Sequence, residues 1–202
     1  FVFLEANPSE ARILRSCRSC LFSQRLMRRD EMIPRVHSSS QSFLQGQQRG
    51  CFSYVGRRGG RQVLNLDRTH PVGIGCFRQG AVAHEMFHAL GFFHTQSRMD
   101  RDEYVSIHWD NIIEGTEHNF AKYSTGPKAG RDLLDYDYYS IMHYPRNAFS
   151  RNGQDTIVSL KSDTSFVGQR IDIFHLDLIK LNKFIKCPRC PATPEKWGDA
   201  KR

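Results

Sequence analysis

The chain has 202 residues, 39% of them hydrophobic, which is enough to bury one substantial core. Its 29 lysines and arginines outnumber 21 acidic residues and leave a formal net charge of +8. No stretch of 18 or more apolar residues occurs, so we predict no membrane span. The positive charge favours acidic partners, but no pattern of a nucleic-acid-binding module accompanies it, so we expect no nucleic-acid partner.

The first quarter of the chain predicts little regular structure. Serine-rich residues 38–42 and glutamine- and glycine-rich residues 45–50 are typical of loops. Pro34 disfavours a central strand around it, because proline has no amide hydrogen for a sheet. We therefore expect no convincing strand before residue 51. The first predicted strand covers residues 63–66.

A helix is predicted over residues 79–90, and it carries the start of the sequence HEMFHALGFFH, which begins at His84. His84 and His88 are four residues apart, so both imidazoles share a helical face and can reach one metal ion. Gly91 can adopt the left-handed conformation that ends a helix, which lets His94 supply a third nitrogen. Three histidines leave the fourth position of a tetrahedral Zn²⁺ open, as in catalytic zinc sites.

The other candidate site residues lie next to this pattern and about fifty residues beyond it. Glu85 adjoins the first histidine and is suited to act as a general base. In the sequence SIMHY at residues 140–144, Met142 is predicted to form an apolar floor beneath the metal. The phenol of Tyr144 can approach the metal and donate a hydrogen bond to an oxyanion.

The remaining histidines lack ligand spacing to this pattern and are expected to be surface or packed residues: His37, His70, His108, His118, His143 and His175. Apolar residues over 173–184 predict a helix packed on the body of the protein. Prolines follow it, and residues 191–202 are predicted to form a flexible tail.

Many further segments resemble the astacin family of metzincin zinc endopeptidases. They lie at residues 51–57, 59–63, 98–102, 109–112, 119–123, 136–138, 148–150, 167–170 and 180–183 and at Cys187. The resemblance covers about residues 51–187. It implies an α+β metzincin fold. An N-terminal subdomain would hold the zinc helix and a mixed twisted sheet, and a mostly irregular C-terminal subdomain would end in a helix.

The resemblance also implies domain limits and roles. We expect a single peptidase domain over residues 1–190, with a poorly matching part at 1–50, a zinc-helix half at 51–94 and a second half at 95–190. His84, His88 and His94 are the implied ligands of one zinc ion. Glu85 is the implied general base. Tyr144 is similar to the family tyrosine that is a fifth zinc ligand at rest and turns to the transition state.

The six cysteines leave several pairings open. The resemblance implies a disulfide between Cys51 and Cys76 and a second one between an early cysteine and Cys187. Cys20 is the favoured early partner, which leaves Cys17 and the extra Cys190 as another bridge or as free thiols. Alternatively, the two C-x-x-C pairs could form a four-thiolate zinc site.

Two positions depart from the family pattern or invite a hypothesis about specificity. The family has a glutamate after the third histidine, and it binds the amino terminus formed on maturation. Thr95 occupies that place and cannot provide the charge. Arg146 lies just past residues 140–144, and by position alone it is a candidate for selecting acidic side chains after the scissile bond.

These observations predict a secreted, extracellular zinc endopeptidase that hydrolyses peptide bonds in proteins or peptides by zinc-activated water, with Glu85 as general base. The alternative is a catalytically impaired relative that binds zinc and acts as an interaction module. Thr95 and the divergent residues 1–50 favour this alternative, whereas the presence of Glu85 and Tyr144 favours the enzyme.

Overall fold

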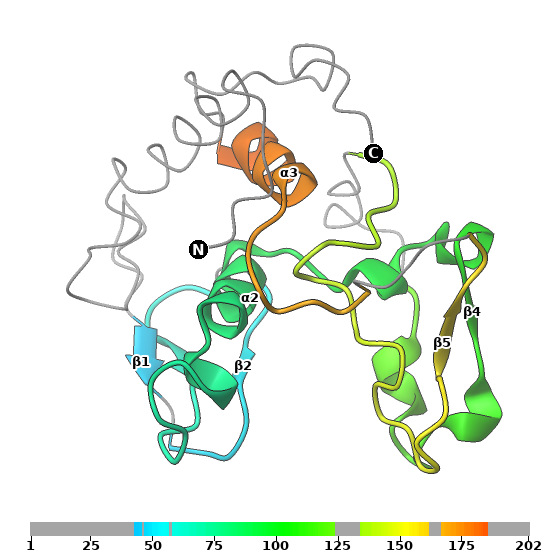
Figure 1. Ribbon diagram of the computed structural model, residues 1–202. Helices are drawn as coiled ribbons and strands as arrows, with labels where there is room; N and C mark the ends of the chain where they lie inside the picture. Colours follow the sequence, from blue (N-terminus) through cyan, green and yellow to red (C-terminus); the bar gives the residue numbers. More distant parts are fainter. Residues whose placement is uncertain (1–42, 46, 57, 124–133, 162–166, 186–202) are drawn as a thin grey trace.

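The computed structural model describes residues 43–45, 47–56, 58–123, 134–161 and 167–185. Two small sheets and two α-helices organise this part of the chain, with short 3-10 helices between them. In Figure 1, α2 (Gln79–Leu90) lies against the first sheet, with β1 and β2 to either side of it in this view and α3 (His175–Ile185) above it, while the β4 and β5 pair lies apart on the right. The 3-10 helices are Gly75–Phe77, Thr95–Ser97, Arg101–Glu103, Trp109–Asn111 and Glu117–Phe120.

The first sheet has the order β1-β3-β2, with strands Phe43–Gln45, Gln62–Asn65 and Phe52–Ser53. β1 pairs with β3 in parallel, and β2 pairs with β3 antiparallel, so the sheet is mixed as predicted. The expectation that no strand precedes residue 51 is wrong. Three residues suffice for β1 because β3 already presents its free edge, a partner that local sequence does not reveal.

Packing against α2 explains why β3 forms where it does. The predicted strand over residues 63–66 begins one residue earlier, and the chain leaves the sheet before Leu66. Both Leu64 and Leu66 are buried, and they form a core cluster with Val82 and Met86 of α2 and with Cys76. Strand and helix therefore bury their apolar residues against each other.

The zinc-site helix begins and ends at the predicted residues. α2 covers Gln79–Leu90, and Gly91 ends it with φ of 98°. In this left-handed conformation the Gly91 amide donates to the carbonyl oxygens of Phe87 and His88. Gly80 serves a different purpose, because a Cβ there would lie 2.1 Å from the carbonyl oxygen of Arg170. The helix can approach residues 169–171 only because this position has no side chain.

The second half is mostly irregular, as predicted. β4 (Val105–Ile107) and β5 (Ile157–Ser159) form an antiparallel pair. A separate core cluster consists of Val105, Ile112, Phe120, Tyr136 and Ile157.

α3 starts two residues later than the predicted 173–184. The side chain of Gln169 accepts hydrogen bonds from the amides of Ile171 and Asp172, which holds that stretch in a turn.

One core cluster joins three distant parts of the chain. It contains Ala83 and Phe87 of α2, Phe92, Ile141 and Met142 of the segment 140–142, and Leu181 of α3. The helix at the carboxyl end thus packs on the same residues as the histidine helix.

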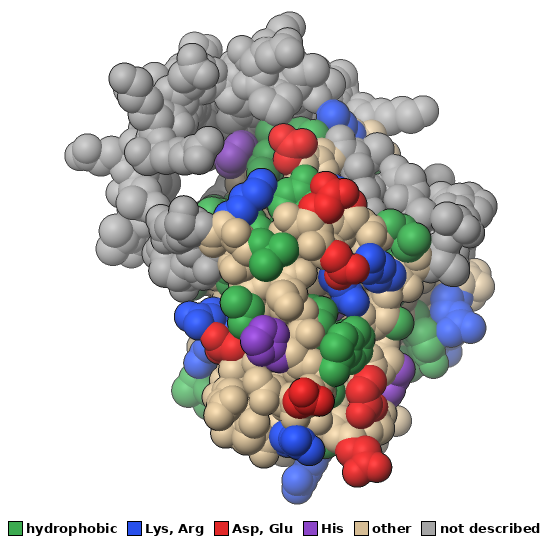
Figure 2. Space-filling model, turned by 90° about the vertical axis from the view of Figure 1, so that its right-hand side faces the viewer, with side chains coloured by type: hydrophobic (Ala, Val, Ile, Leu, Met, Phe, Trp, Pro, Cys, Tyr) green, Lys and Arg blue, Asp and Glu red, His purple; other side chains and the backbone are tan. Residues whose placement is uncertain are grey.

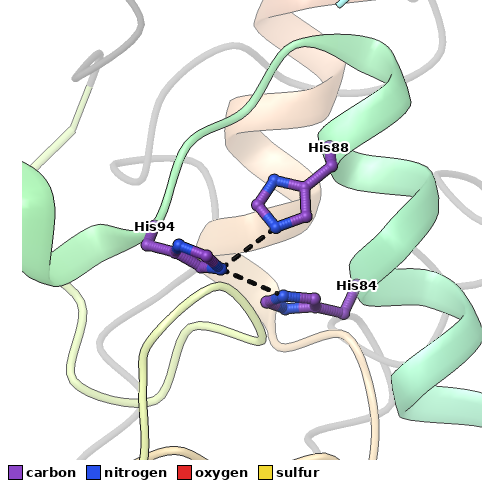
Figure 3. Close-up of side chains that lie close together, drawn as sticks. All are labelled: His84, His88 and His94. Carbon is purple, nitrogen blue, oxygen red and sulfur yellow. Dashed lines mark hydrogen bonds between the residues drawn. The ribbon is translucent and has the colours of Figure 1, made fainter. Parts of the chain in front are cut away.

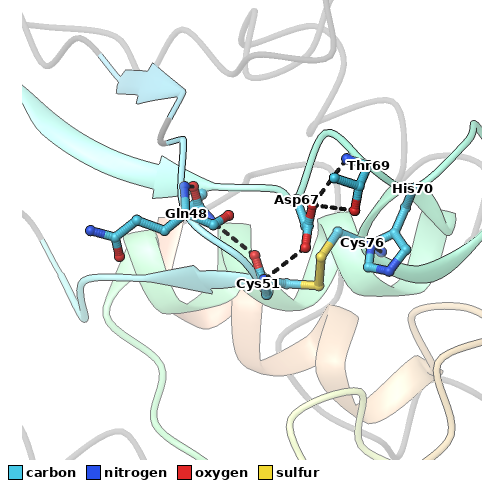
Figure 4. Close-up of a disulfide and its surroundings, with 8 residues drawn as sticks. Gln48, Cys51, Asp67, Thr69, His70 and Cys76 are labelled. Atoms are coloured by element: carbon cyan, nitrogen blue, oxygen red, sulfur yellow. Dashed lines mark hydrogen bonds between the residues drawn. A yellow bond between two sulfur atoms is a disulfide. The ribbon is translucent and has the colours of Figure 1, made fainter.

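A disulfide joins Cys51 to Cys76, as the resemblance implied (Figure 4). Two side chains beside it tie the segment before β2 to the end of β3. The Asn65 amide donates to the carbonyl oxygens of Gln48 and Gly50, and an Asp67 oxygen accepts from the Gly50 amide. The other four cysteines, and the flexible tail predicted for residues 191–202, lie outside the described residues.

Among the described residues, no helix is long and apolar enough to cross a membrane. The face shown in Figure 2 carries acidic and basic side chains interspersed with one another. On this face the basic side chains form no continuous patch.

Candidate metal centre

The three predicted histidine ligands converge on one point (Figure 3). His84 and His88 project from successive turns of α2, and the turn at Gly91 brings His94 back toward them. The Nε2 atom of His94 lies 3.0 Å from that of His88 and 3.3 Å from that of His84. Tetrahedral bonds of about 2.0 to 2.1 Å would hold neighbouring nitrogens about 3.3 Å apart, so the three rings fit a zinc ion.

Backbone carbonyl groups orient two of the rings. The Nδ1 atom of His84 donates to the carbonyl oxygen of Ile141 at 2.7 Å, and that of His88 donates to the carbonyl oxygen of Phe92 at 2.9 Å. A carbonyl oxygen only accepts, so each Nδ1 carries the proton and each Nε2 keeps a lone pair for a metal. Burial lowers the pKa of all three imidazoles, which favours the neutral form that binds metal.

Glu85 lies beside the ligands in a buried position, with 4% of its surface exposed. Its Oε2 atom has no hydrogen-bond partner among the described residues. Burial raises the pKa of Glu85 to about 7, while the positive charge of Arg170 acts in the opposite direction. A carboxylate with a free oxygen and a pKa near neutrality is suited to exchange protons with a water molecule.

Tyr144 lies against the third ligand. Its ring centroid is 4.3 Å from that of His94, and the rings of Phe120 and Phe149 enclose its other sides at 6.0 and 5.7 Å. The Tyr144 amide donates to Oε1 of the fully buried Gln96 at 3.0 Å. Burial raises the pKa of the phenol to about 12, so Tyr144 keeps its proton and can donate a hydrogen bond.

Met142 is buried in the cluster shared with α2 and α3. The apolar floor beneath the metal stays a prediction. The Met142 carbonyl oxygen accepts from the Thr95 amide. Thr95 is buried and lines a pocket together with Ser140. The charged residues that line the same pocket are Arg98, Asp177 and Lys180.

Sequence reasoning missed the contributions of two residues. Arg170 was noted only as part of a segment that resembles the family, and no role was predicted for it. Its positive charge lowers the pKa of Glu85, of Tyr144 and of all three histidines. Asp177 binds the segment that carries Met142, and no sequence pattern indicates it. No spacing rule connects either residue to the histidine pattern. Arg146, the candidate for selecting acidic side chains, pairs with Asp155 on the surface.

Three convergent imidazoles with an adjoining buried glutamate, on a helix that a glycine ends, match the pattern of zinc metallopeptidase sites. The chain belongs to the astacin family, because the model of the peptidase family described as Astacin matches residues 32–186. The predicted family and the zinc cofactor are therefore confirmed. The resemblance begins at residue 32 rather than at residue 51.

Individual relatives agree with this assignment. Zinc metalloproteinase nas-4 of Caenorhabditis elegans is 43% identical over 139 residues, which are 69% of this chain and 42% of that protein. Meprin A subunit beta of Homo sapiens is 46% identical over 140 residues, 68% of this chain and 19% of that protein. The chain therefore spans less than half the length of these two relatives.

A solved structure confirms the fold class. High choriolytic enzyme 1, a hatching enzyme zinc-protease from Oryzias latipes, superimposes with a TM-score of 0.68 and 34% sequence identity. The match covers 91% of this chain and 86% of that one. The α+β metzincin fold predicted from the family resemblance is thus the fold of this chain.

Proposed function

We propose that this chain is a zinc-dependent endopeptidase that hydrolyses peptide bonds in proteins or peptides. The observation that carries the proposal is the unpartnered Oε2 atom of buried Glu85, next to three histidine nitrogens at zinc-ligand spacing. A protein that only binds zinc has no need for a buried carboxylate without a partner, since desolvating it costs free energy.

His84, His88 and His94 would hold the zinc ion, which when bound lowers the pKa of water and polarises the scissile carbonyl group. Glu85 then takes the proton of the attacking water and passes it to the leaving amine. Burial raises the pKa of Glu85 and so strengthens it as a base, whereas the charge of a bound zinc ion would act in the opposite direction.

Tyr144 is proposed to donate its phenolic hydrogen to the oxyanion that develops on the substrate, and it can act as a fifth metal ligand when no substrate is bound. Its position against His94 supports both roles, and its protonated state supports the donor role. Arg170 adds positive charge to the same site and limits the rise in the pKa of Glu85.

An extracellular location and a single domain over residues 1–190 belong to the same proposal. The disulfide between Cys51 and Cys76 supports the location, because disulfides persist in oxidising compartments. The substrate would be an extracellular protein or peptide.

The test is Glu85→Gln, which keeps the shape of the side chain and removes its basicity. We expect the zinc-loaded parent to cleave a mixed peptide library and the variant to lose at least about a hundredfold in rate. Metal analysis should find one zinc per chain in both proteins. A folded, zinc-loaded parent that cleaves nothing would instead identify the impaired, partner-binding relative.

A further inference from the structure

One carboxylate of α3 holds the turn that passes beneath the metal site. Asp177 is 1% exposed, and both of its oxygens bind the same turn. One oxygen accepts from the Ser140 hydroxyl at 2.6 Å, and the other accepts from the Ile141 amide at 2.8 Å. The Ser140 hydroxyl oxygen also accepts from the Met142 amide at 3.1 Å, so the turn is fixed at three consecutive residues.

The same turn orients a metal ligand. The carbonyl oxygen of Ile141, the residue whose amide binds Asp177, accepts from Nδ1 of His84 at 2.7 Å. One residue further, the Met142 carbonyl oxygen accepts from the amide of Thr95, which directly follows His94. A displacement of the turn would therefore tilt the first ligand and disturb the chain beside the third.

We propose that Asp177 is a positioning residue of the zinc site, which acts through Ser140 and Ile141 to fix the ring of His84. The inference rests on the proposed function only in taking His84 as a zinc ligand. Asp177 binds the turn, and its effect passes to His84 through the backbone of the turn. It couples the carboxyl-terminal helix to metal affinity.

The charge and shape of Asp177 both matter. A carboxylate can accept from Ser140 and Ile141 at once, and such charge-assisted bonds are about twice as strong as neutral ones. In Asp177→Asn the single amide oxygen can serve only one of the two donors. The amide group must then face the other, and either the Ile141 amide or the Ser140 hydroxyl loses its acceptor.

The experiment measures metal binding rather than cleavage. Zinc affinity is determined by competition with a chromophoric chelator, and the visible spectrum of the Co²⁺-substituted protein reports ligand geometry. Loss of a group that hydrogen-bonds to a metal ligand typically lowers metal affinity about 10- to 100-fold. Asp177 acts on His84 indirectly, through Ile141, so we expect Asp177→Asn to lower zinc affinity by about tenfold, the lower end of that range. The Co²⁺ spectrum should change as well.

Leu178→Ala is the matched control, because Leu178 is also 1% exposed on α3 but makes none of these bonds. It should lower the thermal midpoint while zinc affinity and Co²⁺ spectrum stay as in the parent. Ser140→Ala leaves the helix unchanged and removes two bonds of the turn, the one to Asp177 and the one from the Met142 amide. It serves if Asp177→Asn does not fold, and its zinc affinity should also fall.

Unchanged zinc affinity in Asp177→Asn, or in Ser140→Ala where that variant replaces it, would overturn the proposal. An equal loss of affinity in Leu178→Ala would do the same. A parent that binds zinc but cleaves no peptide would contradict the proposed peptidase function and leave these measurements valid.

Discussion

At the scale of single residues, the chemistry of the site depends on which atoms carry a proton. The carbonyl groups of Ile141 and Phe92 place protons on Nδ1 of His84 and His88, so their Nε2 atoms face the metal position as acceptors. Burial keeps Glu85 close to its titration point and Tyr144 protonated at neutral pH. Burial raises both pKa values, so it brings Glu85 toward neutrality and moves Tyr144 further above it.

Tyr144→Phe tests the proposed donor role of this residue. The phenylalanine ring keeps the packing on His94, Phe120 and Phe149, so folding and zinc content should remain those of the parent. Loss of one oxyanion donor should lower kcat by about 10²- to 10³-fold with little change in KM. Steady-state kinetics on one peptide substrate measures this.

Tyr138→Phe is its control, because the Tyr138 hydroxyl donates to the Tyr104 carbonyl oxygen and not to a group of the metal site. Its kcat should match that of the parent. Equal kinetics in both variants would remove Tyr144 from the mechanism.

At the scale of elements, α2 packs against β3 and also against the backbone at Arg170. One side packs on β3, while the helix start touches the backbone of Arg170 at Gly80. Glycine inside a helix costs roughly 1 kcal/mol relative to alanine, so helix propensity alone favours replacing it. The contact with Arg170 nevertheless requires glycine at position 80, because the neighbouring atoms belong to the backbone and cannot rotate away.

Gly80→Ala should therefore destabilise the protein despite its better helix propensity. A Cβ atom 2.1 Å from the Arg170 carbonyl oxygen forces the two segments apart, and overpacking of this kind costs about 1 to 3 kcal/mol or more. Urea unfolding of the zinc-loaded protein measures the loss. Gln79→Ala, at an exposed neighbouring position, should stay within about 0.5 kcal/mol of the parent. A stabilised Gly80→Ala would show that the segments separate freely.

At the scale of the whole molecule, hydrogen bonds to buried carboxylates join segments that are distant in the sequence. Asp177 joins α3 to the segment 140–142, and Asp67 joins the end of β3 to Gly50 beside the disulfide. Hydrogen bonds from the Thr69 hydroxyl, the Thr69 amide and the Gly50 amide lower the pKa of Asp67 from 3.8 to about 2. Such a lowered pKa makes the contribution of this joint depend on pH.

The lowered pKa of Asp67 determines how the stability of the protein changes with pH. The folded state prefers ionised Asp67, so its stabilisation is complete above pH 3.8 and disappears as the pH falls toward 2. Asp67→Asn should therefore be less stable than the parent at about pH 6, with a difference that shrinks below pH 3.8. Urea unfolding of both proteins at about pH 6, 4 and 3 measures it. A difference independent of pH would exclude ionisation of Asp67 as the cause.

Local patterns predicted the parts of the fold that local chemistry controls. The bounds of α2 and the turn at Gly91 were predicted correctly, because helical periodicity and glycine's left-handed freedom depend on neighbours in sequence. β1 was missed because its pairing with β3 joins Phe43 to Gln62, across a separation that no local pattern spans. The delayed start of α3 depends on the side chain of Gln169, which a periodicity argument does not include.

The sequence by itself determined the family and the three histidines that can hold a metal ion, with the glutamate beside them. One helical turn and one glycine suffice to bring the three imidazoles together in space. The tertiary structure decided the protonation of these groups, through the carbonyl group of Ile141 and the burial of Glu85. It also brought Arg170 and Asp177 to the site from the far end of the chain. Burial and electrostatic interactions depend on distance in space, and packing alone makes residues distant in sequence into neighbours.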